Sequence, residues 1–568
     1  MCLGHPLSLT SSFSYPLKTY KAMKSKVSGS PASLKLIARL FCAVFFSLLI
    51  LMYSADWWGL NQKPNWPSDK LLMLRVAGSA LLSFFACTLV FWVRGSSAST
   101  RLYFVGWFTV CMVLFLASWP GYFMSDSVSA LKFSLEYPIE LWLGFLKPFI
   151  FSSILQVFPH VSAITFIQLT IVAVVFAYAT EVITFVTGSK KYALAFFALV
   201  AVNPSILFNM ALLSRDTLFS VLVLWAAAFT VKLSHERAIE LSTLLIVGFL
   251  SGLLVALRGD GWFVLLPFLI SFAAITKKLK EPAVVSIVAL SLIALFVWIF
   301  PKMLGYHGND FYYKVANTIN PVGYVLQSRF HTDSGNNKAG IEAVVNLDKL
   351  AAIQTPYEIP YWWNGGVADV DKANPEARNG YLGHVYGFLR ENSGIFLAGR
   401  IETFLASTGF TGVGFKISDA YRVGWPVQWV RPESVNLDLS RGRPFPALTD
   451  IVQKYFTYSV THDLSLRSGS ALFWNFLPSL AISIAALLIP LSVPGLRLAA
   501  FIVLTRVPVV FLAAPASQFK YYLSVQMCGA FFLMLLIAGS KQRLHSAFNK
   551  IRKDHTKNAD QRMLNVEC

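Results

Sequence analysis

Short polar clusters interrupt the apolar stretches of this chain, and their residue types suit proton transfer and phosphate binding. Asp126 follows an apolar stretch and Pro120-Gly121, a pair typical of turns. A carboxylate in this position can accept the proton of a hydroxyl group or orient that hydroxyl. The second cluster is Arg215-Asp216, and an arginine at the end of an apolar segment can bind a phosphate.

The other two clusters also combine charge with turn or aromatic residues. Arg258-Gly259-Asp260-Gly261 is a tight turn between two apolar segments, and its glycines permit a sharp reversal and close backbone approach. Lys520-Tyr521 opens the last apolar segment, where a cation beside aromatic rings suits a lipid-borne phosphate. We expect Arg258 and Lys520 to be removable without leaving a buried charge behind.

Each cluster also has an ordinary structural explanation. Asp126 is a suitable N-cap for a helix that begins at Ser127. Arg215-Asp216 is typical of an ion pair at a lipid interface. The turn at 258–261 can be a plain connector, and Lys520-Tyr521 can be an interfacial aromatic anchor.

The composition is that of a polytopic membrane protein. Of the 568 residues, 55% are hydrophobic and 14% are charged, whereas a soluble domain carries about 25% charged residues. We predict an all-α fold with about twelve transmembrane helices, because a run of roughly 17–25 apolar residues can cross a bilayer. These runs lie near residues 35–54, 72–93, 102–122, 162–185, 192–209, 216–232, 241–257, 262–276, 283–303, 471–490, 496–513 and 521–539.

The placement of basic residues orients the chain in the membrane. The net charge is +19, but segment 304–470 carries equal numbers of acidic and basic residues, so the excess lies in tails and short loops. Lys190, Lys277 and Arg543 are among the basic residues that gather on one side, which the positive-inside rule makes cytoplasmic. Both termini are then cytoplasmic and the polar clusters extracytoplasmic. Several ionisable residues that meet at span ends on one face indicate a functional site.

Residues 139–158 are the ambiguous segment. They are apolar enough to suggest a crossing, but they contain Glu140, Lys147 and Pro148. A crossing there would move the Lys190-Lys191 loop and the basic C-terminal tail to the outside. We therefore predict an interfacial or shallowly re-entrant helix within an outer loop at 123–161.

The sequence divides into tails, membrane regions and one large loop. The predicted parts are a cytoplasmic tail at 1–34, a transmembrane region at 35–303, a mainly helical extracytoplasmic loop domain at 304–470, C-terminal transmembrane helices at 471–540 and a basic cytoplasmic tail at 541–568. Within the loop domain we expect helices around 340–353 and 381–406, and an aromatic-rich stretch at 361–366.

Several kinds of chemistry receive no support. None of the six cysteines lies in 304–470, which excludes a disulfide framework or thiolate metal site there. The histidines show no metal-ligand spacing, so no metal site is predicted, although a divalent cation stays open as a cofactor. Walker, dinucleotide and Gly-x-Ser-x-Gly motifs are missing, which argues against nucleotide-driven transport and serine hydrolysis.

The order of these motifs resembles the GT-C class of integral-membrane glycosyltransferases, particularly poorly characterised bacterial families within it. Met124-Ser125-Asp126-Ser127 places an acid in the first large outer loop, and Asn203-Pro204 then leads to Arg215-Asp216. The 258–261 turn follows, and Lys520-Tyr521 heads the final span.

The resemblance covers residues 119–540, with the GT-C-like membrane part beginning near residue 102, and it has two departures. Tyr137-Pro138 stands where many relatives have His-Pro, which removes any role for an imidazole there. Arg215-Asp216 stands where many have Lys-Asp, a change that keeps the charge.

The resemblance implies an inverting glycosyltransferase that needs no nucleotide and no nucleic acid. It would move a sugar from a polyprenyl-phosphate (undecaprenyl) carrier to a cell-envelope glycan, such as lipopolysaccharide or O antigen, outside the bacterial inner membrane. Its partners would be this donor, the glycan acceptor and the bilayer. It implies Asp126 as the catalytic residue. The substrate-binding residues would be Arg215, Asp216, Arg258, Asp260, Lys520 and Tyr521.

Two other functions stay open. An O-antigen or polysaccharide polymerase or ligase acts on undecaprenyl-diphosphate-linked chains and tends to use arginines of a large outer loop, where Arg329, Arg390 and Arg400 are available. A transporter or flippase would have inverted repeats, or broken helices with charges near the bilayer midplane. The sequence shows no internal repeat, and its charges gather at the outer ends of predicted spans.

Overall fold

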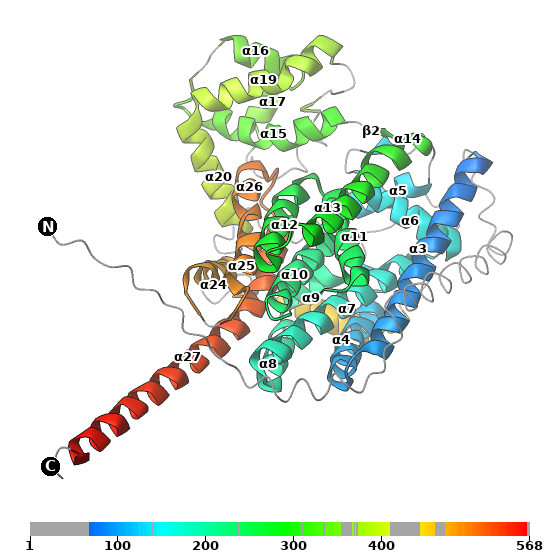
Figure 1. Cartoon of the computed structure of the whole chain (residues 1–568). Coiled ribbons are helices and arrows are strands. Elements are labelled where there is room, and N and C mark those ends of the chain that lie inside the picture. Colours follow the sequence, from blue (N-terminus) through cyan, green and yellow to red (C-terminus); the bar gives the residue numbers. More distant parts are fainter. Residues whose placement is uncertain are drawn as a thin grey trace.

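Helices dominate the structure, a computed structural model (Figure 1). It describes residues 67–123, 125–135, 137, 140–141, 144–158, 160–236, 239–308, 310–332, 335–353, 366–368, 370, 373–408, 444–459, 472–491 and 493–564. In these ranges the strands are two residues long, and β1 (Glu140–Leu141) pairs in parallel with β2 (His307–Gly308). The predicted first span at 35–54 lies outside the described residues, as does most of the aromatic stretch at 361–366.

The described helices form a bundle with a separate helical unit above it (Figure 1). The first half of the bundle consists of α3 (Ser68–Gly95), α4 (Ala98–Ala117), α5 (Ser125–Leu135), α6 (Leu146–Val157), α7 (Val161–Thr187), α8 (Lys190–Ala201), α9 (Pro204–Ala211) and α10 (Arg215–Leu233). The second half consists of α11 (Leu241–Leu257), η1 (Gly259–Gly261), α12 (Trp262–Thr276), α13 (Lys280–Ile293), η2 (Ala294–Ile299), α14 (Phe300–Met303), α22 (Pro446–Tyr458), α24 (Leu477–Leu488), α25 (Leu496–Leu504), α26 (Arg506–Ala513), η5 (Phe519–Tyr522) and α27 (Leu523–Leu564).

The bundle has the lengths and composition of a multi-pass membrane protein. Eight helices in the described ranges are long and apolar enough to cross a bilayer, or up to nine if α8 and α9, bent by 71°, form one broken span. The apolar α11 and α24 are shorter, with 17 and 12 residues. The predicted all-α, multi-pass character is confirmed, whereas the count of twelve spans stays a prediction.

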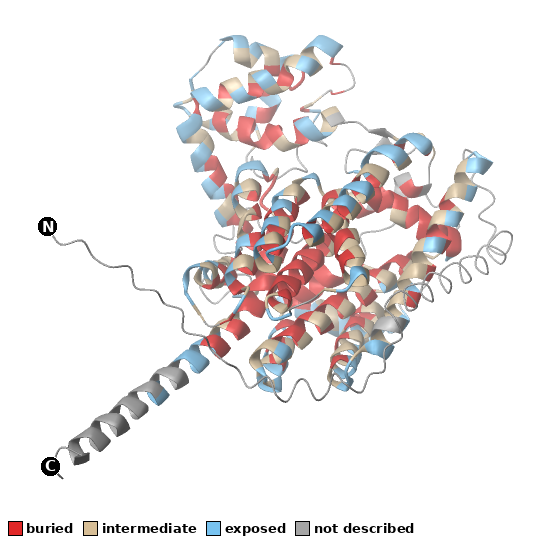
Figure 2. Cartoon of the chain, in the orientation of Figure 1, coloured by how far each residue is buried: buried red, intermediate tan, exposed pale blue. Residues whose placement is uncertain are grey.

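The surface of the bundle is apolar where lipid would contact it. Buried residues gather along the centre, and the outward faces of the flanking helices are exposed (Figure 2). These outward faces carry large apolar side chains, among them Leu102, Leu194, Ile270 and Ile287. Large exposed apolar side chains on many helices are the expected boundary of a helical bundle with a bilayer.

The segment between α4 and α7 leaves and returns at one end of the bundle. The two helices run antiparallel, because Tyr103 and Trp107 of α4 hydrogen-bond Thr184 and Thr180 of α7 at 2.8 and 2.9 Å. Residues 118–160 therefore begin and end on the same side. Within them α6 has 12 residues, fewer than a crossing needs, and its buried side chains pack against α3, α5 and α7.

The upper unit has a hydrophobic core of its own, distinct from that of the bundle. It contains α15 (Asp310–Gln327), α16 (Gly335–Glu342), α17 (Leu347–Ala351) and α19 (Pro375–Glu391), and α20 (Ser393–Ser407) leads from it to α26 (Figure 1). Its centre includes Tyr381, whose hydroxyl lies 3.0 Å from that of Thr318. The helices expected around 340–353 and 381–406 fall within this unit; that it forms an extracytoplasmic domain stays a prediction.

Candidate functional site

Several helix ends meet at one place in the bundle and bring the predicted polar clusters together. α10 begins there at Arg215, α11 ends at Leu257 beside η1, α12 starts after η1, and η5 leads into α27. Helix ends carry unsatisfied backbone groups and open side-chain positions, so such a junction can hold polar residues inside an apolar bundle.

Arg258 and Arg506 share the Asp260 carboxylate. The Arg258 guanidinium binds Asp260 at 2.7 Å through Nε, and another of its nitrogens forms an ion pair with Asp216. Arg506 Nε binds the second Asp260 oxygen at 3.0 Å. Both guanidinium groups also lie over the ring of the buried Phe219, at 5.7 and 4.6 Å. Stacking against an aromatic face adds to the stabilisation of buried cations.

Lys520 continues the network to Asp126. Its Nζ lies 3.2 Å from Asp126 Oδ2 and 3.7 Å from Asp216 Oδ2. Carboxylates and cations therefore alternate in one connected chain. The order along that chain is Asp126, Lys520, Asp216, Arg258, Asp260 and Arg506. We call these six residues the charge cluster.

Local sequence explains why two of the carboxylates stand where they do. Ser214 is the N-cap of α10, and its hydroxyl accepts the Asp216 N–H and donates to Asp216 Oδ2, both at 3.1 Å. Asp216 thus lies in the first turn of α10, where the helix dipole favours a negative charge. Gly261 closes the turn after Asp260, and a Cβ there would run into the Leu254 carbonyl.

Backbone contacts bring the loop that carries Asp126 to the start of α10. Tyr122 and Leu212 form an isolated parallel bridge, and Leu213 N–H donates to the Tyr122 carbonyl at 2.9 Å. The Ser127 hydroxyl donates to the Leu213 carbonyl. Residues far apart in sequence are in this way fixed next to each other, which places Asp126 within reach of Lys520.

Asp126 is not the N-cap of a helix that begins at Ser127, the ordinary explanation considered for it. α5 begins at Ser125, so Asp126 lies inside its first turn, and its carboxylate contacts Lys520. Burial acts to raise the pKa of the Asp126 carboxyl, but the charges of Lys520, Arg215 and Lys147 outweigh burial and lower that pKa to about 2. The side chain keeps 20% exposure and is the most accessible carboxylate of the cluster.

Two expectations about the cations need correction. Arg258 and Lys520 were expected to be removable without leaving a buried charge, yet Arg258 pairs with Asp216 and Asp260, and Lys520 with Asp126 and Asp216. Both side chains are largely buried. Removing either would leave two carboxylates with one cation fewer in a largely buried site, a substantial cost in stability.

The remaining predicted residues flank the cluster. Arg215 is the first residue of α10, is half-buried, and acts electrostatically on Asp126. Tyr521 is buried, and its ring lies 5.5 Å from Lys520 Nζ and 5.7 Å from the Arg258 guanidinium. Its backbone carbonyl accepts a hydrogen bond from Arg506 at 2.7 Å.

The sequence interpretation missed two cations, Arg506 and Lys147. Arg506 lies in the middle of the predicted span 496–513, and an arginine so far from a span end is a sufficient signal for a site. Lys147 belongs to the ambiguous segment 139–158, where it served only as evidence against a crossing. In the structure its Nζ donates to the Asp126 carbonyl at 3.3 Å, and its side chain is buried.

Other candidate groups lie outside the charge cluster. Arg329 and Arg390 are exposed, and Arg400 is buried with a hydrogen bond of 3.0 Å to the Ala514 carbonyl. In the part of the chain that the structure describes, no group of three or more His, Cys, Asp or Glu side chains is placed to hold a metal ion.

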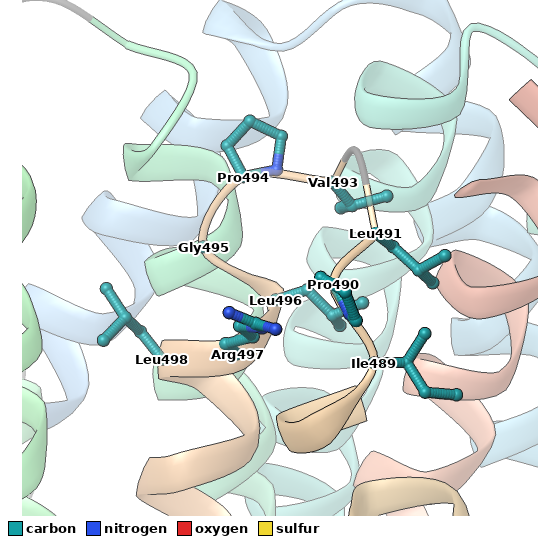
Figure 3. Close-up of a pocket in the computed structure, with 9 residues that line it drawn as sticks. All are labelled: Ile489, Pro490, Leu491, Val493, Pro494, Gly495, Leu496, Arg497 and Leu498. Carbon is teal, nitrogen blue, oxygen red and sulfur yellow. The ribbon is translucent and has the colours of Figure 1, made fainter. Parts of the chain in front are cut away.

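A cavity of about 380 Å³ lies in the link between α24 and α25, lined by residues of 489–498 (Figure 3). A Cβ on Gly495 of this link would meet Ser234, which follows the end of α10. Since α10 has 19 residues, at 1.5 Å per residue its two ends are roughly 28 Å apart. The cavity is therefore at the opposite end of the bundle from the charge cluster and is not part of this site.

No protein-family model, curated protein or solved structure matches the chain. The likeness to the GT-C class therefore rests on the motifs described above. The geometry itself defines a buried cluster of mixed charge, open at Asp126, inside a multi-pass membrane protein. Such a cluster can bind an anionic group and can orient a hydroxyl next to it.

Proposed function

We propose that the protein is a GT-C-type glycosyltransferase that moves a sugar from a polyprenyl-phosphate carrier to a cell-envelope glycan. The reaction would take place on the extracytoplasmic face of a bacterial inner membrane. One observation carries this proposal: a cluster of cations and carboxylates is buried in an apolar bundle, with the Asp126 carboxylate at its accessible edge. A lipid-linked donor reaches such a site from the bilayer, and a polar acceptor reaches it from water.

The reaction would be a single displacement with inversion. The acceptor oxygen bonds to the anomeric carbon while the bond from that carbon to the carrier phosphate breaks, and the phosphate leaves with the electron pair. Asp126 orients the acceptor hydroxyl and takes its proton as positive charge develops on the attacking oxygen. Because the pKa of Asp126 is lowered to about 2, it is a weak base, and orientation is the larger part of its contribution.

The cations of the cluster would act on the carrier phosphate only indirectly, by holding the carboxylates in place. Arg258 and Arg506 are bound to carboxylates, so neither offers a whole guanidinium to a ligand. They pair with Asp216 and Asp260 and so fix the start of α10 and of η1. The three cations and three carboxylates of the cluster cancel, so the positive charge that would favour a departing phosphate is that of the flanking Arg215 and Lys147.

The direct test is reconstitution of the purified protein in proteoliposomes with a polyprenyl-phosphate sugar and an envelope glycan. The expected product is the glycosylated acceptor, and mass spectrometry of glycans from a deletion strain should show the loss of the same sugar. Complementation with the wild-type chain, but not with Asp126→Asn, should restore it. An unchanged glycan profile in the deletion strain, together with no transfer in proteoliposomes, would contradict the proposal.

A transporter or flippase is the second candidate, and two features favour it. α8 and α9 form a helix broken by 71°, and the buried Arg506 lies within the apolar span Leu496–Ala513. Broken helices beside buried charges are typical of transporters. Movement of a labelled prenyl-phosphate sugar across the proteoliposome membrane without any acceptor would support transport. Loss of the sugar from the carrier only when an acceptor is present would support transfer.

A further inference from the structure

Lys147 is a buried ammonium that the charge cluster does not neutralise. Its side chain is 6% exposed, and its hydrogen bond in the described structure is to the Asp126 carbonyl at 3.3 Å. Its Nζ also lies 5.5 Å from the centre of the Phe151 ring. An ammonium group has three donors, and none of the described carboxylates lies within ion-pair distance of this one.

The surroundings of Lys147 are rich in positive charge. Arg215 and Lys520 both act electrostatically on it, and Asp126 is the carboxylate that acts on it. The same Asp126 is already bound to Lys520. A buried cation without a direct counter-ion is costly in an apolar environment, so this corner of the site favours an anionic ligand.

We propose that a lipid-borne phosphodiester binds with its negative charge at Lys147, between the first turn of α5 and the start of α10. This inference rests on the proposed function and names the group that holds the donor. Lysine suits the role because its compact charge and three donors can serve several oxygens of one phosphate. The phosphate would then lie beside the turn that carries Asp126, which orients the acceptor.

The assignment moves the phosphate contact away from Arg258 and Lys520. Those two cations already satisfy Asp216, Asp260 and Asp126, and a ligand would have to compete with these carboxylates. At Lys147 a ligand would not have to displace a carboxylate. The short α6 that carries it packs against α5 and α7, so its position relative to Asp126 is set by helix packing.

The test is direct binding of a short-chain prenyl phosphodiester to the full-length protein in phosphatidylcholine nanodiscs. Lys147→Met keeps the length of the side chain and removes the charge, and Lys147→Arg keeps the charge. We expect Lys147→Met to raise the dissociation constant about ten- to a hundredfold, the value of a charge-assisted hydrogen bond. The dissociation constant of Lys147→Arg should stay within a few-fold of the wild-type value, because the charge is kept. Lys191→Met, an exposed lysine at the other end of the bundle, is the matched control and should bind like wild type.

Two further arms identify the source of the phosphate. The uncharged prenol of the same length should show no dependence on Lys147. Binding of phosphatidylglycerol in place of the prenyl ligand, if it depends on Lys147, would assign the site to an ordinary phospholipid headgroup. Equal binding of every ligand to wild type and to a folded Lys147→Met variant would overturn the proposal, with folding checked by the thermal unfolding midpoint.

Failure of this inference can be told apart from failure of the proposed function. Lys147-dependent binding without any sugar transfer would leave the phosphodiester site standing and remove the transferase. Sugar transfer by Lys147→Met with unchanged KM for the donor would keep the transferase and remove Lys147 from the donor site.

Discussion

The two ends of the bundle carry charges of different kinds. At the end where α10 begins, the charges are buried and alternate in sign, as in the pairs of Arg258 with Asp216 and of Lys520 with Asp126. At the other end, charges are exposed and mostly basic, as at Lys190, Lys277 and Arg497. Exposed charges of one sign orient a membrane protein, whereas buried charges of both signs require a function or a structural partner.

The difference shows which charges can be interpreted from position alone. A basic residue at the exposed end contributes to the total positive charge that orients the chain in the membrane, so any single one can be replaced. A residue of the charge cluster has defined partners, so each replacement removes a specific ion pair. The predictions below test this contrast, from the largest expected effect to the smallest.

Topology gives the largest effect because its readout is all or none. Reporter fusions after residues 190, 235, 279 and 545 should be cytoplasmic, and fusions after 130, 214 and 350 extracytoplasmic, as the distribution of basic residues predicts. An external reporter after residue 190 would mean that 139–158 crosses the membrane. It would also reverse the side to which every later loop is assigned.

Asp126→Asn should lower turnover about 10²–10⁴-fold, the usual contribution of a general base or orienting carboxylate. Asparagine keeps the size of the side chain but removes the charge that pairs with Lys520. Because Lys520 keeps its contact with Asp216 and Asp126 lies at the accessible edge of the cluster, the protein should still be expressed and inserted in the membrane. The measurement is the rate of sugar transfer in proteoliposomes, with Asn203→Asp, a polar change at the N-cap of α9, as the control.

A near wild-type rate for Asp126→Asn would shift the catalytic role to another carboxylate. Asp260 would then be the strongest candidate, because its side chain is 18% exposed while that of Asp216 is 3% exposed.

The sequence located most of the buried cluster because polar residues interrupt apolar runs. Asp126, Asp216, Arg258, Asp260 and Lys520 all lie next to a predicted span end. The sequence could not give their pairing, since Lys520 contacts Asp126 and Arg506 contacts Asp260 across hundreds of positions. Pairing depends on which helices pack together, and hydrophobicity alone does not specify that.

The sequence interpretation missed two features, although the sequence contains the signal for each. Arg506 was counted within an unbroken span, although an arginine there has to find a partner. The segment 192–209 was predicted as one helix, but it breaks at Asn203-Pro204, where Asn203 caps α9 by accepting the Ser205 and Ile206 N–H groups. Proline disfavours a helical conformation in the preceding residue, and asparagine is a strong N-cap.

Arg506→Gln should destabilise the protein, whereas Arg497→Gln should not. Arg506 is 4% exposed and binds both the Asp260 carboxylate and the Tyr521 carbonyl, so glutamine leaves a buried carboxylate with one cation fewer. The expected cost is about 3 kcal/mol, the lower end for breaking a buried ion pair. Arg497 is exposed at the other end of the bundle. Because surface charges contribute little, its replacement should lower the free energy of unfolding by less than about 1 kcal/mol.

Thermal unfolding in detergent measures both variants. Equal unfolding midpoints for Arg506→Gln and Arg497→Gln would show that the charge cluster tolerates the loss of an arginine as well as the exposed end does. The contrast between the two ends would then fail.

The smallest expected effect is a pH dependence of binding through Lys147. Burial lowers the pKa of Lys147 to about 7, with Arg215 and Lys520 acting in the same direction and Asp126 opposing them. Lys147 is therefore charged below pH 7 and increasingly neutral above it. If the charged form binds the phosphodiester, the dissociation constant should rise about tenfold between pH 6 and pH 8. A phosphodiester is the right probe because its own charge does not change in this interval. Lys147→Arg should abolish the pH dependence, since a guanidinium remains charged throughout, while Lys191→Arg at the exposed end should leave it unchanged. A flat profile in the wild-type protein, or an equal slope in Lys147→Arg, would mean that the titration of Lys147 does not control binding and that the charge lies elsewhere in the cluster.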